Sequence, residues 1–145
     1  MRVVLDTNVL VSGLLTPFGT CGAILRMLTA GEIVLCVDAR ILLEYDAVLR
    51  RPKFAFAPQR VDAVMAYIQS VSEHCDCLPL EHPLPDEDDN QFLEVALSAR
   101  ALCLVTGNVR HFPKHSLRGM PVLSPQQFIE TARQHRTGKS GNPRR

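Results

Sequence analysis

Acidic and amide side chains stand beside short apolar runs at several separated points of this chain. Asp6 ends the run RVVL, and Asn108 follows the run LCLVT after one glycine. Glu44 falls within a largely apolar stretch, and residues 86–89 are four consecutive acids. Carboxylates that share a crevice repel one another, and Mg²⁺ or Mn²⁺ relieves this repulsion through oxygen ligands. A cation held in this way can activate water and neutralise a phosphate, so these residues could support phosphate-ester hydrolysis.

Each of these acids also has an ordinary structural interpretation. An Asp after a strand commonly caps the next helix, and an acidic run usually forms a solvated loop with one capping member. A helical Glu commonly faces solvent. Taken singly, each acid is therefore better explained by a structural role. A metal site is favoured only if several of these acids come together in one crevice. We expect Asn8 to cap the helix after Asp6, which leaves Asp6 free to face the crevice.

Continuously apolar runs alternate with segments of helical period along the chain. This alternation is typical of a parallel sheet covered by helices on both faces, so we predict an α/β fold. Ligands in such folds bind beyond the carboxyl ends of the strands, where the strand order reverses. The expected strands are residues 2–5, 33–37, 75–80, 102–106 and 120–124, and the expected helices are residues 9–15, 21–31, 39–51, 58–73, 91–101 and 125–136.

The composition is that of one globular domain, with 145 residues, 46% hydrophobic and 21% charged. We predict a single domain over residues 1–136 and a disordered basic tail over residues 137–145. No apolar run approaches the roughly 20 residues of a membrane span, so we expect a cytoplasmic protein that makes no membrane contact. Five cysteines, an odd number lying mostly in apolar stretches, favour reduced thiols.

The charges are distributed unevenly although the net charge is only +1. Residues 110–145 hold eight of the sixteen basic residues and a single acid, Glu130. An acidic focus within a chain that has a basic end suits a metal site acting on a polyanion. Arg50, Arg51 and Lys53 stand at the end of the helix of Glu44. They could complement the helix C-terminus, contact phosphate at the rim of the crevice, or do both.

Several alternative sites have weaker support. A phosphatase loop of the Asp-x-Asp-x-Thr type would need an acid where Asn8 stands and a threonine where Leu10 stands. His74, Cys75, Cys77 and His82 lack the usual Cys-x₂₋₄-Cys spacing of a zinc site. His111 and His115 are interpreted as surface loop residues, with phosphate contact as the alternative.

Four motifs carry a resemblance that covers nearly the whole predicted domain. They are VVLDTNVLVSGLL (3–15), ILLEYDAVLRRPKF (41–54), DEDDNQFLEVALSARALCLVTGN (86–108) and PVLSPQQFI (121–129). Together they resemble the PIN-domain family of metal-dependent nucleases, and in particular bacterial VapC-like toxins of toxin–antitoxin systems. The resemblance implies a Rossmann-like three-layer α/β/α sandwich with strand order 3-2-1-4-5. It also implies a ribonuclease that uses Mg²⁺ or Mn²⁺.

The resemblance assigns roles to individual residues. Asp6, Glu44 and Asp89 match the three main acids, which bind metal and act in catalysis, and Asp86 matches as an auxiliary acid. Asn108 stands where the family often has a fourth acid, and this departure removes one negative charge while keeping an oxygen ligand. Thr106 and Asn8 match polar residues that support the acids.

The function predicted from these motifs is metal-dependent endoribonuclease activity, as the toxin of a type II toxin–antitoxin system. The alternative is a nucleic-acid-binding PIN-like module with weak or no catalysis, because Asn108 replaces an acid. Apart from the RNA substrate, the partners implied by the resemblance are a cognate antitoxin and a second copy of the chain in a homodimer.

Overall fold

The computed structural model describes residues 1–140, with side chains to residue 137. The central strands are short runs of mainly aliphatic residues. The central strands β1 (Arg2–Leu5), β2 (Val34–Val37) and β4 (Cys103–Val105) are almost wholly buried. Branched side chains pack well on a pleated surface that is covered on both faces, which explains why these segments form the centre of the sheet.

The five strands form one parallel sheet with the order β3-β2-β1-β4-β5. Val3 is opposite Cys103 and Leu5 is opposite Val105, so β1 and β4 end side by side. The edge strands β3 (Glu73–His74) and β5 (Val122–Leu123) have two residues each. This order confirms the α/β fold and the 3-2-1-4-5 topology predicted from the resemblance.

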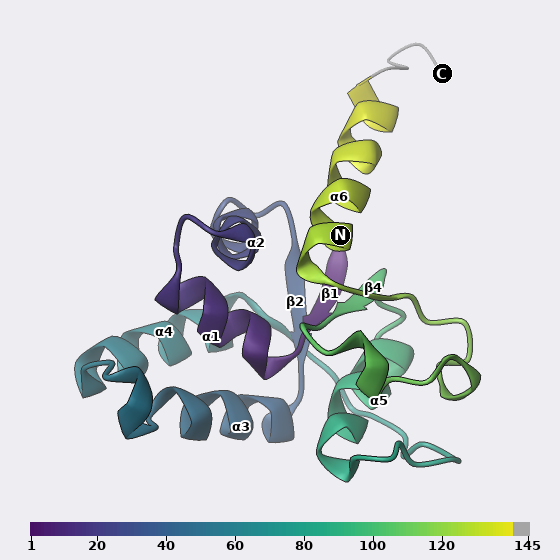
Figure 1. Ribbon diagram of the computed structural model, residues 1–145, viewed down its shortest axis with the longest axis horizontal. Helices are drawn as coiled ribbons and strands as arrows, with labels where there is room; N and C mark the ends of the chain where they lie inside the picture. Colours follow the sequence, from purple (N-terminus) through teal and green to yellow (C-terminus); the bar gives the residue numbers. More distant parts are fainter. Residues whose placement is uncertain (141–145) are drawn as a thin grey trace.

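Helices cover both sides of this sheet. In Figure 1, α1 to α4 lie on one side of β1 and β2, α5 lies on the other, and α6 projects beyond the sheet. The largest fully buried side chains are Tyr45, Phe92 and Phe128, which come from three different helices. The helices are α1 (Thr7–Leu15), α2 (Thr20–Thr29), α3 (Ala39–Leu49), α4 (Pro58–Val71), α5 (Asn90–Ser98) and α6 (Pro125–Ser140), and the short 3₁₀ turns are η1 (Pro52–Phe54), η2 (Glu87–Asp89), η3 (Val109–His111) and η4 (Lys114–Ser116).

The N-cap of α1 differs from our prediction. Asp6 caps this helix by accepting a hydrogen bond from the Thr7 amide at 2.8 Å, whereas Asn8 lies within the first helical turn. The helix can begin directly after β1 because Asp6 has extended backbone angles and a side chain short enough to reach the first amide. An aspartate also caps α3, since Asp38 accepts a hydrogen bond from the Ile41 amide at 3.0 Å.

The third strand also differs from our prediction of residues 75–80. It consists of exposed Glu73 and His74, and pairing with β2 ends where the Cys75 amide donates to the Val37 carbonyl at 2.9 Å. Exposed polar residues are tolerated at the edge of a sheet. The apolar residues within 75–80 were therefore a wrong indicator of where this strand lies.

The last helix is longer than predicted. We expected α6 to end at residue 136, but it continues to Ser140, with the Thr137 hydroxyl donating to the Arg133 carbonyl at 2.9 Å. Residues 141–145, the rest of the predicted tail, lie outside the described residues. Within residues 1–140 no single helix is long and apolar enough to span a membrane. Only α1 and α2 taken together, with a bend of 98° between them, have the length and the apolar composition of a span. All five cysteines are free thiols.

Candidate active site

The carboxyl ends of β1 and β4 join at Asp6 and Thr106. The Asp6 amide donates to the Val105 carbonyl at 2.9 Å, and the Thr106 hydroxyl donates to Asp6 Oδ2 at 2.7 Å. Asp6 Oδ2 also accepts from Asn8 Nδ2 at 3.2 Å. Burial raises the pKa of Asp6, and these donors oppose that rise because they favour the charged form. Asp6 is therefore both the helix cap and a buried carboxylate at the crevice.

Asn8 connects α1 to the turn after β4. Its Oδ1 accepts from the Gly107 amide at 3.0 Å, while its Nδ2 contacts Asp6. A Cβ at Gly107 would lie 3.2 Å from Asn8 Oδ1, so glycine permits this close approach. Asn8 thus fixes the relative positions of two loops that border the crevice.

Glu44 reaches the same crevice from α3. The neighbouring Tyr45 is fully buried and donates its hydroxyl to the Leu5 carbonyl at 2.5 Å, which holds α3 against the end of β1. The Thr7 hydroxyl donates to Glu44 Oε2, and Gln91 Nε2 donates to Oε1 at 3.1 Å. Burial, followed by repulsion from Asp6, raises the pKa of Glu44.

Thr7 and Gln91 were not among the predicted site residues. Thr7 directly follows the first acid, and Gln91 lies one turn or less from the acidic run, so adjacency in sequence was the available signal. Their hydrogen bonds to Glu44 depend on how α1, α3 and α5 pack together, and this packing is not encoded in local spacing.

Asp89 occupies the N-cap position before α5 and is 8% exposed. Its Oδ2 is buried and has no hydrogen-bond partner among the described residues, with His111 Nδ1 at 3.5 Å as the facing group. Burial and the charges of Asp6, Asp86 and Glu44 raise the pKa of Asp89 to about 6, while His111 opposes the rise. An isolated buried carboxylate oxygen is costly, so this atom needs a proton or a cation.

These side chains line one cleft with a volume of about 470 Å³. The cleft contains all five predicted metal-site residues, namely Asp6, Glu44, Asp86, Asp89 and Asn108, together with Asn8, His111 and Arg51. Asp86 is exposed at the rim and accepts from the Asp88 amide at 3.0 Å. The Asn108 amide donates to the Thr106 hydroxyl at 3.0 Å, which holds the start of the following loop beside the cleft.

The three predicted nucleic-acid-binding residues have different surroundings. Arg51 lines the cleft. Arg50 forms ion pairs with Asp46 at 3.1 Å and Asp62 at 2.5 Å, and Lys53 lies 5.0 Å from the centre of the Phe54 ring. Arg51 is therefore the one of the three that the structure brings to the cleft.

Comparison with known proteins identifies the family. A model of the PIN domain matches residues 2–110. The chain belongs to the PIN domain family. It is 29% identical over 141 residues to the uncharacterised protein MJ1680 of Methanocaldococcus jannaschii, and the alignment covers 90% of each chain.

The fold is similar to that of a chain in the crystal structure of VapBC2 from Rickettsia felis bound to a DNA fragment from their promoter. The TM-score is 0.58 at 14% sequence identity, and the match covers 86% of this chain and 98% of the other. At this level of identity the likeness concerns the fold, and it supports the PIN architecture found here.

The donor chemistry of the PIN cleft fits a hard divalent cation. Three buried or half-buried carboxylates and an amide could supply oxygen ligands, and Asp89 Oδ2 has no hydrogen-bond donor among the described residues. Within the described chain, however, no group of three or more His, Cys, Asp or Glu side chains is arranged closely enough to hold a metal ion. Water would therefore complete the coordination, as is usual for Mg²⁺.

The histidines and cysteines considered for a zinc site are not grouped in this way. Among the described residues, His74, Cys75, Cys77 and His82 form no cluster of three or more side chains that could hold a metal ion. His111 was interpreted as a surface histidine; its side chain is 52% exposed, but it lines the cleft of the PIN domain.

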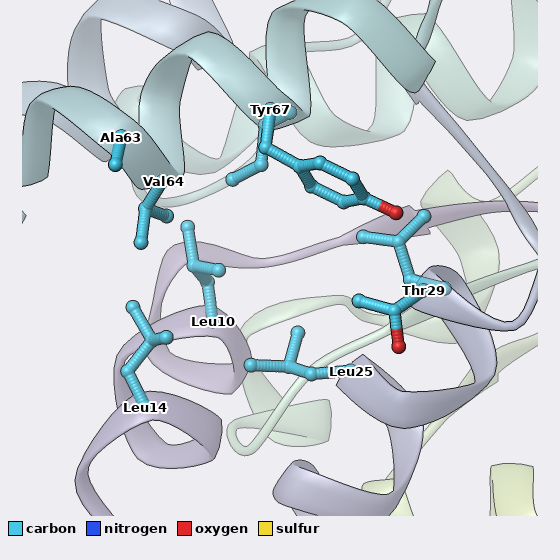
Figure 2. Close-up of a pocket in the computed structure, with 9 residues that line it drawn as sticks. Leu10, Leu14, Leu25, Thr29, Ala63, Val64 and Tyr67 are labelled. Carbon is cyan, nitrogen blue, oxygen red and sulfur yellow. The ribbon is translucent and has the colours of Figure 1, made fainter. Parts of the chain in front are cut away.

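A separate cavity of about 280 Å³ lies between α1, α2 and α4. Figure 2 shows Leu10 and Leu14 from α1 and Leu25 from α2 facing Val64 and Tyr67 of α4. Its lining is apolar apart from the Thr29 and Tyr67 hydroxyls and contains no carboxylate, so this cavity lacks the acids found in the cleft.

Proposed function

We propose that this PIN-domain protein is a metal-dependent endoribonuclease. The observation that carries the proposal is the convergence of Asp6, Glu44 and Asp89, from three separate segments, on one cleft. Their raised pKa values indicate carboxylates that lack full compensation within the chain. Perturbed carboxylates grouped in a cleft are typical of functional sites.

Asp6, Glu44 and Asp89 would hold Mg²⁺ or Mn²⁺, with Asp86 and Asn108 as further oxygen donors. When bound, such a cation supplies an activated water and neutralises charge on the scissile phosphate. Attack by that water would leave a 5′-phosphate and a 3′-hydroxyl.

Neighbouring side chains orient the acids. Thr106 and Asn8 both donate to Asp6 Oδ2, and these two hydrogen bonds fix the orientation of the carboxylate. Thr7 and Gln91 do the same for Glu44. Arg51 at the cleft would contact a substrate phosphate. These bonds reduce the reorganisation that substrate binding would otherwise require.

The test is cleavage of structured RNAs by purified protein with Mg²⁺ or Mn²⁺, with EDTA, and with the Asp6→Asn variant. We expect the variant to lose at least about 100-fold in rate, since it removes a ligand and a charge that the transition state needs. Asp76→Asn is the matched control, because Asp76 is exposed and does not line the cleft. Cleavage that persists in EDTA or in Asp6→Asn would refute the mechanism.

The second candidate function is a nucleic-acid-binding module with weak or no catalysis. Asn108 at the cleft, where the family often has an acid, is the observation that favours it. Calorimetric titration distinguishes the two functions, because the absence of binding at millimolar Mg²⁺ and Mn²⁺ would support the binding module.

We further propose that the protein is a cytoplasmic VapC-like toxin with a cognate antitoxin and that it forms homodimers. Similarity to a chain of the VapBC2 structure supports a protein partner. Co-expression with the product of a short adjacent open reading frame should yield a stable complex with inhibited RNA cleavage. Light scattering of the purified chain tests the dimer, and a monomer at micromolar concentration would exclude it.

A further inference from the structure

Several arginines of the described chain are held in ion pairs. Arg40 pairs with Asp38 and Glu94, Arg50 pairs with Asp46 and Asp62, and Arg2 and Arg136 pair with Glu73 and Glu32. By contrast, Arg110, Lys114 and Arg118 have no side-chain hydrogen bond or ion pair with any residue that the structure describes. These three are grouped in the segment 109–118, which contains no acid, whereas other arginines without such a bond, such as Arg100 and Arg133, lie in other segments.

This segment, named here the basic loop (residues 109–118), begins directly after Asn108 at the cleft. Two buried side chains anchor it, since Phe112 is 3% exposed and Leu117 is 8% exposed. The turns η3 and η4 shape the backbone between them. The apolar anchors hold the loop on the core while Arg110, Lys114 and Arg118 all face solvent.

The basic loop and Arg51 come from separate parts of the chain that both lie next to the cleft. Arg51 follows α3, whereas the basic loop follows β4, and His111 of the loop lines the same cleft as Arg51. The cleft interior carries the acids. Arg51 and His111 line the acidic cleft itself, whereas Arg118 lines a separate cavity that also contains Glu94. Exposed positive groups next to an acidic interior match a polyanion that has its reacting group inside and its flanking charges outside.

We propose that the basic loop binds the phosphodiester backbone of RNA next to the scissile phosphate. This inference rests on the proposed function. It places the RNA strand that enters the cleft on the side of the cleft where β4 ends. The contacts would be to phosphates, so they would give affinity and register without reading the base sequence. Unpaired exposed cations lose little on binding, since no internal ion pair has to break.

The test compares two charge-matched variants in the cleavage-blocked Asp6→Asn background, in EDTA. The first is Arg110→Gln/Lys114→Gln in the basic loop. The control is Arg60→Gln/Arg133→Gln, because Arg60 lies over the Phe56 ring and Arg133 lines a separate cavity between α2 and α6. Binding of a fluorescein-labelled single-stranded 20-mer RNA is followed by anisotropy at several KCl concentrations.

We expect the basic-loop variant to bind about 10-fold more weakly at 100 mM KCl and to lower the slope of log K against log [KCl] by about 1.4, or 0.7 for each lost contact. The control should stay within about 2-fold of the background, and both variants should melt within about 2 °C of it. Equal losses in both variants, no loss in either, or no measurable RNA binding would each overturn the proposal.

Two further outcomes separate this inference from its alternatives. Displacement of RNA by an equal charge concentration of poly-glutamate would show a general site for acidic chains and would overturn the assignment to nucleic acid. Because the assay measures binding without cleavage, loop-dependent binding by an inactive enzyme would contradict only the proposed nuclease. Cleavage without loop-dependent binding would contradict only the present inference.

Discussion

Asp6 combines two roles that our sequence interpretation assigned to different residues. Its Oδ1 caps α1 through the Thr7 amide, and its Oδ2 receives the Thr106 hydroxyl and the Asn8 amide. A carboxylate has enough lone pairs to accept all three bonds and still bind a cation. Asp89 is the opposite case, because its buried Oδ2 has no hydrogen-bond donor among the described residues. The two acids should therefore respond differently to pH and to metal.

Ionisation of Asp89 should destabilise the metal-free protein. The pKa rises from 3.8 to about 6 in the folded chain, so the penalty is absent below about pH 4, grows between about pH 4 and 6, and is fully present above. We expect Asp89 to lower the free energy of unfolding by up to about 3 kcal/mol across this window. Asp89→Asn should remove that decrease in urea unfolding measured in EDTA at pH 4 and pH 7.5.

Asp76→Asn is again the control, because it replaces an exposed acid outside the cleft and should leave the pH profile unchanged. An Asp89→Asn profile that still follows the parent between pH 4 and 6 would exclude Asp89 as the source of the effect.

Asn108 offers a direct test of the missing fourth acid. Asn108→Asp adds a carboxylate to a cleft that already contains Asp6, Glu44 and Asp89. We expect about 10-fold tighter Mn²⁺ binding in calorimetry, because one more negative charge attracts a divalent cation strongly at short range. Gln59→Glu adds the same charge at an exposed position on α4 and should leave the affinity unchanged. Equal affinities for Asn108→Asp and the parent would show that this position does not contact the metal.

At the scale of the elements, α3 and α5 must keep a fixed separation because they carry Glu44 and Gln91, which bond to each other. Arg40 near the start of α3 connects the two helices, with Nη1 at 2.6 Å from Glu94 Oε1. The Glu94 side chain is 8% exposed, and its other oxygen accepts from the Leu80 amide at 2.8 Å. Loss of Arg40 would leave a buried carboxylate without its cation.

Arg40→Met should destabilise the fold by about 2–4 kcal/mol, since removal of one partner leaves a buried charge uncompensated. Arg40→Met/Glu94→Gln should recover part of this loss. Arg50→Met is the comparison, because Arg50 pairs at the surface and should cost at most about 1 kcal/mol. Urea unfolding at pH 7.5 measures all three, and equal costs for Arg40→Met and Arg50→Met would contradict this account.

At the scale of the whole molecule, the cleft gathers groups from most of the chain. Asp6 follows β1, Glu44 belongs to α3, Asp89 precedes α5 and Asn108 follows β4. A ligand that binds these groups together stabilises the folded state and has no comparable site in the unfolded chain. Metal binding should thus be visible as global stabilisation, independently of catalysis.

We expect Mn²⁺ or Mg²⁺ at about 100 times its dissociation constant to raise the free energy of unfolding by about 2.7 kcal/mol, which corresponds to a melting shift on the order of 5–10 °C. Differential scanning calorimetry with KCl at matched ionic strength measures the shift. Asp89→Asn should lose most of it and Asp76→Asn should retain it. A parent protein with the same melting temperature in metal and in EDTA would exclude the site.

Much of the fold was predictable because its signals are local. Apolar runs identified β1, β2 and β4, and helical periodicity identified six helices within a few residues of their observed bounds. Errors occurred where tertiary context decides. The edge strand β3 consists of exposed Glu73 and His74 because it pairs on one side only, and no apolar pattern marks such a strand.

The candidate site, like the fold, could be predicted only in part from the sequence. The sequence by itself determined which residue types stand at the ends of the strands, and the resemblance to the PIN family selected Asp6, Glu44, Asp89 and Asn108 among them. Only the tertiary structure decided which donors satisfy each acid, that Arg50 is occupied by other ion pairs, and that Asp89 Oδ2 has no donor among the described residues. Hydrogen bonds and burial depend on the packing of segments distant in sequence, such as Thr106 against Asp6, and local spacing carries no record of that packing.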